Sequence, residues 1–428
     1  MEYIRGLLGL AFLIGFAYLF SQQKKQIDWR LVGIGISLQI IFGLLITKVG
    51  FVKNAFAWAS EKFVILLSCS AEGSKFLFGD FVDTTQYGFV FALQVLPTVI
   101  FFSTVTAGLY YLGILQIIVK SIAYVMSRTM RLSGAEALSA AGNIFLGQTE
   151  APLLVRPFVP KMTKSELMCL MTGGMATIAG GVLAGYVAFL GGDDPVEQSK
   201  FAAYLLSASI MNAPAAIVIS KILIPETNKE AINKSLNVSS DSLGVNLVDA
   251  LSNGAADGLK LALNIGGMLL AFIALIAALN YILISIGDVF GLNMMIIEST
   301  NGQFAGFSLE YILGQIFRVF AFIIGVNWNE SLQVGSLLGQ KMVVNEFVAY
   351  LGLAEFKAAG ALSPKSVLIA TYALCGFANF SSIAIQIGGI GGMAPNQQGN
   401  LSKLGFRALL AATIATMMTA TIAGAING

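Results

Sequence analysis

Long apolar segments recur along the chain, separated by short polar stretches. A helix needs about 20 mostly apolar residues to cross the hydrocarbon core of a bilayer. Eight segments meet this length, at positions 2–20, 31–49, 86–112, 164–190, 198–223, 258–287, 364–392 and 400–426. The first ends in Phe-Ser-Gln-Gln-Lys-Lys, with no small-residue cleavage site after it, so we expect it to be retained. The pattern predicts an all-α integral membrane protein with eight transmembrane helices.

Three further stretches mix apolar residues with lysine, arginine or serine at roughly helical spacing. They cover residues 51–72, 113–131 and 308–326. The first two in particular indicate amphipathic helices that lie along the membrane interface.

The stretch 133–158 has a different pattern, because polar residues interrupt an apolar segment. It is predicted to be helical to about Phe145, to break near Gly147 and to resume briefly before Pro157. Two half-helices joined at a glycine-containing tip form a re-entrant helical hairpin. Residues 328–353 fit the same description.

The order of these elements repeats along the chain. Each unit contains a span, an interfacial helix, a hairpin and two further spans. Three crossings per unit is an odd number, so the second unit is inverted relative to the first. Inverted repeats with discontinuous helices are typical of secondary transporters, whose binding site lies at the interface between the repeats.

This organisation divides the chain into four parts. Residues 1–112 hold N-terminal scaffold helices and an interfacial helix, and 113–223 form the first half of a transport part. Residues 224–307 contain a connecting loop and a long scaffold span, and 308–428 form the second half of the transport part.

The composition agrees with a membrane protein and excludes several other classes. Hydrophobic residues make up 56% of the chain and charged residues only 11%, against about 25% charged in soluble domains. There is no histidine, which excludes imidazole catalysis. The net charge of +2 does not indicate nucleic acid as a partner. The three cysteines lie far apart in apolar segments and predict neither disulfides nor a zinc site.

The distribution of basic residues predicts the orientation. If the N-terminus is outside and the hairpins do not cross, most basic residues are cytoplasmic. These are Lys24, Lys25, Arg30, Lys120, Arg128, Arg131, Arg156, Lys161, Lys164, Lys221, Lys229, Lys234, Lys260, Lys403 and Arg407. We therefore expect both termini outside.

The fourth and seventh spans are rich in small residues and carry polar groups near their middle. Thr177 lies in one, and Asn379 and Ser382 lie in the other. Small residues also let membrane helices pack closely, which is an alternative explanation for the glycines. An unwound backbone is tolerated in a membrane where protein or a watery cavity covers it. We favour broken helices that line a cavity.

Each hairpin contains a carboxylate, Glu150 in the first and Glu346 in the second. A charge near the bilayer centre costs at least ~2.5–3.5 kcal/mol, so such residues face a partner or a cavity. One interpretation is an ion pair with Arg156, Arg318 or Lys341. The other is hydrogen bonding to a polar solute.

The neighbours of these carboxylates favour a solute that combines a heterocyclic base and a sugar. One group offers donors and acceptors suited to a base edge, namely Gln148, Thr149 and Glu150. The other offers acceptors suited to sugar hydroxyls, namely Asn345, Glu346, Asn379 and Ser382.

Asn143, in the first hairpin, suits a cation site. Its side-chain oxygen, the Thr177 hydroxyl and carbonyls freed near the helix breaks would form an all-oxygen shell, which hard cations prefer. In discontinuous membrane helices such carbonyls coordinate Na⁺. The alternative is that Asn143 only caps a broken helix.

Three motifs, GQTEAPLLVRPF, NEFVAY and GFANFSSIAIQIGG, occur in an order that resembles the concentrative nucleoside transporter family over essentially the whole chain. The resemblance implies a homotrimer in the bacterial cytoplasmic membrane, with eight spans and a mobile transport part in each protomer. It implies that the nucleobase meets Gln148, Thr149, Glu150 and Val182, and that the ribose meets Glu346, Phe377, Asn379 and Ser382.

The resemblance also implies a sodium site, formed by Asn143, Thr177 and the carbonyls of Leu146 and Ile178. Some members of the family have serine where this chain has Thr177, and the hydroxyl is kept. Some members couple to protons, so a proton carried by Glu150 or Glu346 is an alternative coupling ion. The expected partners are a nucleoside, Na⁺, the bilayer and further copies of the chain, without an organic cofactor.

Two functions from other classes are weighed against sodium–nucleoside symport. An intramembrane hydrolase would use Glu150 and Glu346 as an acid–base pair, but no nucleophile or metal motif flanks them. A channel would not accumulate solute against a gradient, and it leaves the inverted repeat and hairpins harder to explain.

Overall fold

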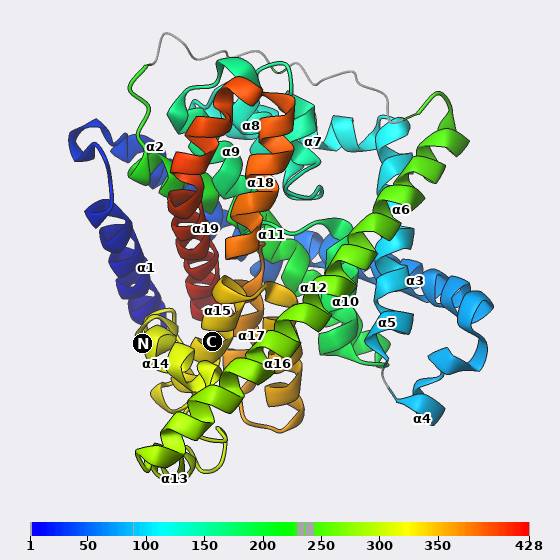
Figure 1. Ribbon diagram of the computed structural model, residues 1–428. Helices are drawn as coiled ribbons and strands as arrows, with labels where there is room; N and C mark the ends of the chain where they lie inside the picture. The colour runs from blue at the N-terminus through cyan, green and yellow to red at the C-terminus, as the bar shows by residue number, and fades with distance from the viewer. Residues whose placement is uncertain (1, 89, 229–235, 237–243, 428) are drawn as a thin grey trace.

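The computed structural model describes residues 2–88, 90–228, 236 and 244–427, which contain helices and no strand. Lys229 and Lys234, expected to be cytoplasmic, lie outside the described residues. The N-terminal elements are α1 (Glu2–Leu19), η1 (Lys24–Gln26), α2 (Trp29–Lys48), α3 (Gly50–Phe78), η2 (Gly79–Val82), α4 (Thr84–Tyr87), α5 (Phe91–Gln94), α6 (Leu96–Tyr111) and α7 (Ile114–Met130) (Figure 1).

Two series of similar elements follow, joined by a long helix. The first series is α8 (Gly134–Gly142), η3 (Ala151–Val155), η4 (Val159–Lys161), α9 (Lys164–Ala176), α10 (Gly180–Gly191) and α11 (Pro195–Leu223). The joining helices are α12 (Leu247–Val289) and α13 (Leu292–Ser299). The second series is α14 (Leu309–Ile323), η6 (Trp328–Glu330), α15 (Ser331–Val343), α16 (Glu346–Ala358), α17 (Pro364–Leu374), α18 (Phe380–Met393), η7 (Pro395–Gln397) and α19 (Gln398–Asn427).

Seven helical segments in the described part of the chain are long and apolar enough to cross a membrane. They correspond to seven of the eight spans that the hydrophobic pattern predicts. The eighth, 364–392, is divided into α17 and α18, of 11 and 14 residues, and neither is long enough to span alone. The stretches predicted as interfacial helices are helical as α3, α7 and α14.

The predicted helix breaks in the fourth and seventh spans are confirmed, and the two breaks touch. Thr177, directly after α9, has an extended backbone with φ −117° and ψ 170°. Gly376, between α17 and α18, has φ +128°, which favours glycine. A β-carbon added to Gly376 would lie 2.6 Å from the Ala176 carbonyl oxygen. The Asn212 side chain of α11 donates to that oxygen at 2.7 Å and to the Cys375 carbonyl at 3.2 Å.

The stretch predicted as the first hairpin contains two short arms. Ser133 and Glu136 form a capping box that starts α8. The helix ends at Gly142, three residues earlier than the sequence pattern indicates, and the second arm is the 3₁₀ helix η3. In the second stretch, α15 and α16 are full helices separated by Val344 and Asn345.

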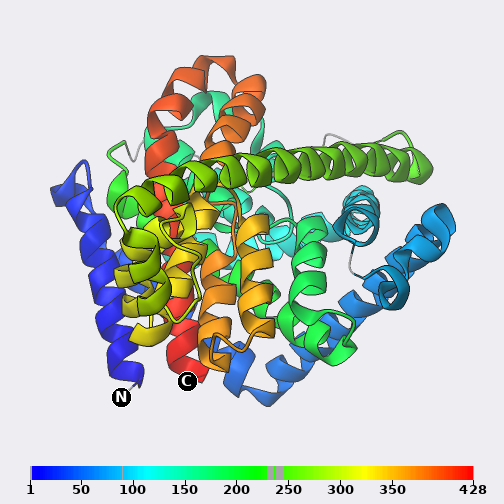
Figure 2. The same cartoon turned by 60° about the horizontal axis from the view of Figure 1, so that its bottom comes forward.

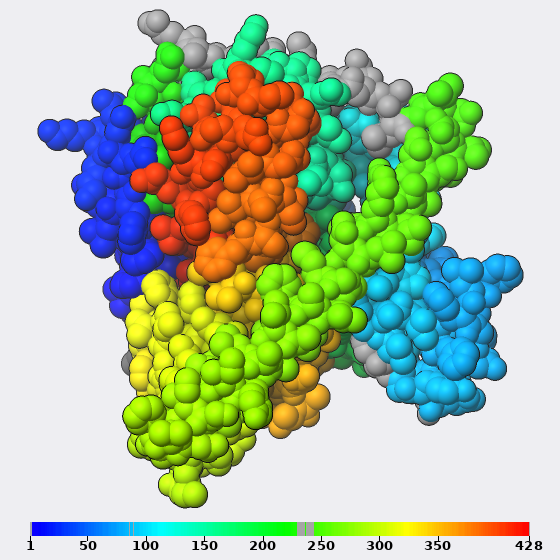
Figure 3. Space-filling view, viewed as in Figure 1, coloured from blue at the N-terminus to red at the C-terminus, as the bar shows by residue number. Residues whose placement is uncertain are grey.

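The helix α12 is longer than the apolar pattern indicates. It has 43 residues and begins at Leu247, not at 258, because the Asn246 side chain caps it by accepting from the Asp249 amide at 2.9 Å. Polar residues in its first turns hide this extension from a hydrophobicity criterion. The helix runs across the outside of the other helices as one continuous rod (Figure 2). It forms an exposed ridge on this face of the molecule (Figure 3). Large apolar side chains of α12, such as those of Leu263 and Leu270, are exposed.

The buried core lies around the broken helices. In the hydrophobic windows of α9–α10 and α19, 89% of residues are buried, compared with 6% in α12. The helices α11 and α19 pack against each other and against α9 and α17. The chain therefore surrounds its two helix breaks with a tightly packed group of helices, and its termini lie on the same side of the molecule (Figures 1 and 2).

Candidate functional site

A buried cluster of polar side chains lies where the second hairpin stretch meets the break between α17 and α18. Glu346 is the first residue of α16, and Asn379 is the N-cap of α18. The Asn379 amide donates to Glu346 Oε2 at 2.8 Å, and its oxygen accepts from the Ser382 backbone amide at 2.8 Å. Both side chains are 3% exposed. The first turn of a helix has free N–H groups and favours negative charge, which fits the position of Glu346.

Gln148 joins this cluster from the tip of the first hairpin stretch. Its Nε2 donates to the Ser382 hydroxyl at 3.0 Å. The Asn379–Ser382 bond therefore connects Gln148 to Glu346 through one continuous set of hydrogen bonds. Three elements that are far apart in sequence thus present an amide, a hydroxyl, a second amide and a carboxylate to one place.

Two members of the cluster are absent from the residues singled out in the sequence. Tyr186 of α10 donates its hydroxyl to Glu346 Oε1 at 3.0 Å. Gln386 of α18 donates to Gln148 Oε1 at 3.2 Å and to the Met171 carbonyl at 3.1 Å. The sequence does contain a signal for Gln386, since Asn379, Ser382 and Gln386 repeat at intervals of three and four, as on one helix face.

Thr149 and Glu150, expected beside Gln148, are exposed and lie outside this cluster. The Thr149 methyl group lies next to α18, 3.3 Å from a β-carbon added to Gly389. The Glu150 carboxylate accepts from the Gly147 backbone amide. It also lines a cavity of about 300 Å³ between α6, α12 and the first hairpin stretch, together with Thr106, Tyr110 and Asp257.

The apolar residues expected at the site are buried close to the helix breaks. Val182 of α10 is 2% exposed and Phe377, in the second break, is 9% exposed. Among the described residues, neither Glu150 nor Glu346 forms an ion pair with Arg156, Arg318 or Lys341. The hydrogen-bonded cluster therefore replaces the ion-pair interpretation for Glu346.

Asn143, directly after α8, has a buried side-chain amide. Its side chain is fully buried, and within the described residues neither its oxygen nor its nitrogen has a hydrogen-bond partner. Its backbone occupies the C-cap position of α8, but the side chain does not cap the helix. Its amide nitrogen lies against Gly173, whose carbonyl accepts from the Thr177 hydroxyl at 2.9 Å. A buried amide without partners is costly, so a ligand that binds its oxygen would stabilise this arrangement.

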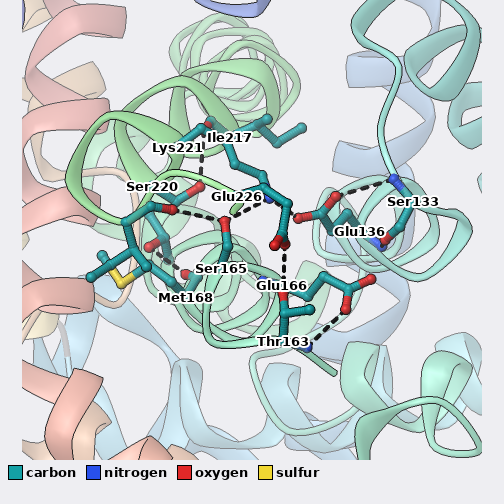
Figure 4. A network of polar contacts seen from close by, with 12 residues as sticks. Ser133, Glu136, Thr163, Ser165, Glu166, Met168, Ile217, Ser220, Lys221 and Glu226 are labelled. Carbon is teal, nitrogen blue, oxygen red and sulfur yellow. Dashed lines mark hydrogen bonds and ion pairs between the residues drawn. The ribbon is translucent and has the colours of Figure 1, made fainter. Parts of the chain in front are cut away.

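A network of polar contacts fixes the ends of α8, α9 and α11 to one another (Figure 4). Lys221 of α11 forms a buried ion pair with Glu136 of α8 and donates to the Ser165 hydroxyl of α9 at 2.9 Å. Thr163, the N-cap of α9, donates to Glu226 at 2.6 Å. The network holds the base of the first hairpin stretch while its tip carries Gln148.

The fold and the site define a multi-pass membrane protein with a buried cluster of polar side chains at the meeting point of two broken helices. Three family models match the chain. They describe a Na⁺-dependent nucleoside transporter N-terminus over residues 8–81, a nucleoside recognition gate over 92–193 and a Na⁺-dependent nucleoside transporter C-terminus over 204–424.

Similar proteins span nearly the whole chain. It is 42% identical to an uncharacterized transporter of Bacillus subtilis, with 99% of each chain covered. It is 41% identical to solute carrier family 28 member 3 of Mus musculus over 98% of this chain and 58% of the mouse protein. A structure of CNTnw in an inward-facing substrate-bound state superposes with a TM-score of 0.90 at 39% identity, covering 100% of this chain and 98% of that chain.

The chain therefore belongs to the concentrative, Na⁺-dependent nucleoside transporter family. The family consists of transporters and not of enzymes, so the hydrolase alternative is excluded.

Proposed function

We propose that this protein imports nucleosides, uridine-like ones and also purine nucleosides, by symport with Na⁺ through alternating access. The observation that carries the proposal is the buried hydrogen-bonded cluster that links Gln148 and Ser382 to Asn379 and Glu346. These groups are hydrogen-bonded to one another. A nucleoside would exchange these bonds for its own, so that no buried polar group is left unpaired.

The two sides of the cluster would contact different parts of the nucleoside. Gln148, Thr149, Glu150 and Val182 would contact the base, and Glu346, Asn379, Ser382 and Phe377 would contact the ribose. Thr149 and Glu150 lie apart from the cluster, so they would meet the base only after the tip of the first hairpin rearranges. Tyr186 and Gln386 would orient Glu346 and Gln148.

The proposed Na⁺ site consists of Asn143, Thr177 and the carbonyls of Leu146 and Ile178. The unpartnered Asn143 amide supports it, because Na⁺ would give the buried oxygen a ligand. Bound Na⁺ would order the tip that carries Gln148. The affinities for Na⁺ and nucleoside then rise together, since coupling between sites is reciprocal.

The proposed architecture has eight crossings, with 133–158 and 328–353 as re-entrant hairpins. Residues 113–223 and 308–428 would move against a scaffold of 1–112 and 224–307. We propose a homotrimer in the bacterial cytoplasmic membrane with both termini outside. The exposed apolar face of α12 supports contact with lipid or a second copy, and the termini on one side of the molecule suit an even number of crossings.

Uptake of labelled uridine into liposomes that hold the purified protein tests the proposal. A sodium gradient is compared with a proton gradient, and Asn143→Ala is measured beside the wild type. Accumulation driven by sodium and lost in Asn143→Ala is the expected result. Accumulation driven only by protons would move the coupling to Glu150 or Glu346, and equilibration without accumulation would indicate a channel.

A further inference from the structure

The second hairpin stretch carries a buried lysine that the proposed function does not use. Lys341 lies in the last turn of α15 and is 2% exposed. Its Nζ donates to the Ala373 carbonyl oxygen at 2.9 Å and to the Thr416 hydroxyl at 3.2 Å. A buried ammonium is costly inside a membrane protein unless oxygen atoms surround it. These contacts are of the kind that a bound monovalent cation makes.

The carbonyl that binds Lys341 lies at a helix break. Ala373 is the residue before Leu374, where α17 ends. The last carbonyls of a helix have no partner within the helix and carry partial negative charge. In discontinuous membrane helices, such half-helix ends coordinate Na⁺. The lysine therefore places its charge where a free cation would otherwise be attracted.

The same arrangement exists in the first series of elements, without a lysine. There α8 packs on α9, which packs on α11, and in the second series α15 packs on α17, which packs on α19. Asn143 directly follows α8 and lies against Gly173 in the last turn of α9. Lys341 is in the last turn of α15 and binds Ala373 in the last turn of α17.

The two positions differ in one chemical respect. The Asn143 amide is buried without a partner among the described residues, whereas the Lys341 ammonium has two oxygen partners. The first position therefore needs a cation from solution to satisfy its oxygen atoms. The second position already contains a cation, attached to the chain.

We propose that the Lys341 ammonium is a tethered cation that occupies, in the second repeat, the place that Na⁺ takes in the first. This inference rests on the proposed Na⁺ site at Asn143. One diffusible cation then accompanies each nucleoside, and shortening Lys341 uncovers a latent monovalent-cation site at Ala373 and Thr416. The second hairpin stays fixed to its broken helix at all times, whereas the first is fixed only when Na⁺ is bound.

Binding of radioactive sodium to the purified full-length chain, at saturating uridine, tests this inference. The wild type is expected to bind one Na⁺ per chain, Lys341→Ala two, and Lys341→Arg one. In liposomes, the sodium dependence of uridine uptake by Lys341→Ala becomes sigmoidal. Its half-saturating sodium concentration rises at least about tenfold, because a tethered cation is replaced by one from solution. Methylammonium is expected to restore the single-sodium behaviour.

A folded Lys341→Ala that still binds one Na⁺ per chain would overturn the inference while leaving the proposed function in place. An unchanged sodium count in Asn143→Ala would instead overturn the proposed sodium site. Lys341→Ser serves as a second variant, since it leaves the same space and adds a hydroxyl ligand. Both variants are purified in high sodium and in choline. If neither folds even in high sodium, the latent site is refuted, because Na⁺ should replace the missing charge.

Discussion

Glu346 is the carboxylate of the buried cluster and accepts two of its hydrogen bonds. It accepts from Tyr186 and from Asn379, and it starts a helix. A glutamine at position 346 keeps the shape of the side chain but replaces the charged carboxylate acceptor by a neutral amide. Hydrogen bonds to charged groups contribute about 1.5–3 kcal/mol.

We therefore expect Glu346→Gln to reduce uptake of all nucleosides by about 10- to 100-fold, since each hydrogen bond to the charge is weakened. Initial uptake rates of uridine and adenosine in liposomes measure this. Glu355→Gln, an exposed change on the same helix, is the control and should leave uptake unchanged. Uptake by Glu346→Gln equal to that of the wild type would refute the ribose assignment.

Tyr186 contributes one hydrogen bond to Glu346 and a large packing surface. Its ring stacks on Tyr350 with centroids 4.4 Å apart, and a phenylalanine preserves this contact. Loss of the hydroxyl alone leaves Glu346 Oε1 without its donor. We expect Tyr186→Phe to lower the affinity for nucleoside roughly 3- to 10-fold, as for one net hydrogen bond.

The matched control is Tyr350→Phe, because its hydroxyl donates to the Thr371 carbonyl, outside the cluster. Isothermal titration of uridine into both variants, in saturating sodium, compares them. Equal affinities in the two variants would show that the Tyr186 hydroxyl does not position Glu346.

At the scale of elements, the ion pair between Lys221 and Glu136 connects α11 to α8 in a buried place. Removing one partner of a buried pair leaves the other charge without compensation and costs about 3–5 kcal/mol. Lys221→Met is therefore expected to lower the thermal unfolding temperature in detergent by several degrees. The double variant with Glu136→Gln should recover most of the loss.

The control for this change is Lys200→Met. Lys200 pairs with Glu197 at 2.9 Å, but its side chain is 46% exposed. Exposed pairs contribute about 0–1 kcal/mol, so its unfolding temperature should stay near that of the wild type. A Lys221→Met variant as stable as Lys200→Met would mean that the ion pair does not hold the base of the first hairpin stretch.

The sequence predicts most of the elements, because membrane helices depend on apolar length and breaks depend on small and polar residues. The breaks at Thr177 and at Gly376 follow from this logic. The start of α12 does not, since a capped polar extension has no apolar pattern. Nor does the separation of Glu150 from Gln148, because a turn with its own internal hydrogen bond sets the direction of each side chain.

At the scale of the whole molecule, the proposed alternating access requires α12 to change its distance from the helices proposed to move. Spin labels at Leu263 of α12 and Phe406 of α19 test this in a Cys69→Ser background, because both positions are exposed and Cys69 is the exposed cysteine among the described residues. Labelled protein is mixed with excess unlabelled protein, so that labels in neighbouring copies do not contribute.

The distance distribution for Leu263 and Phe406 is expected to shift when Na⁺ and uridine are added together, and less with either alone, because the two ligands are coupled. A second pair at Val196 and Phe406, both exposed on α11 and α19, lies within the part proposed to move and should keep its distances. A shift in both pairs would mean that the transport part deforms internally. Unchanged distances in both pairs would refute movement against a fixed α12. A ligand shifts the equilibrium between two states when its affinities for them differ, so coupled Na⁺ and uridine should change the populations of the proposed states.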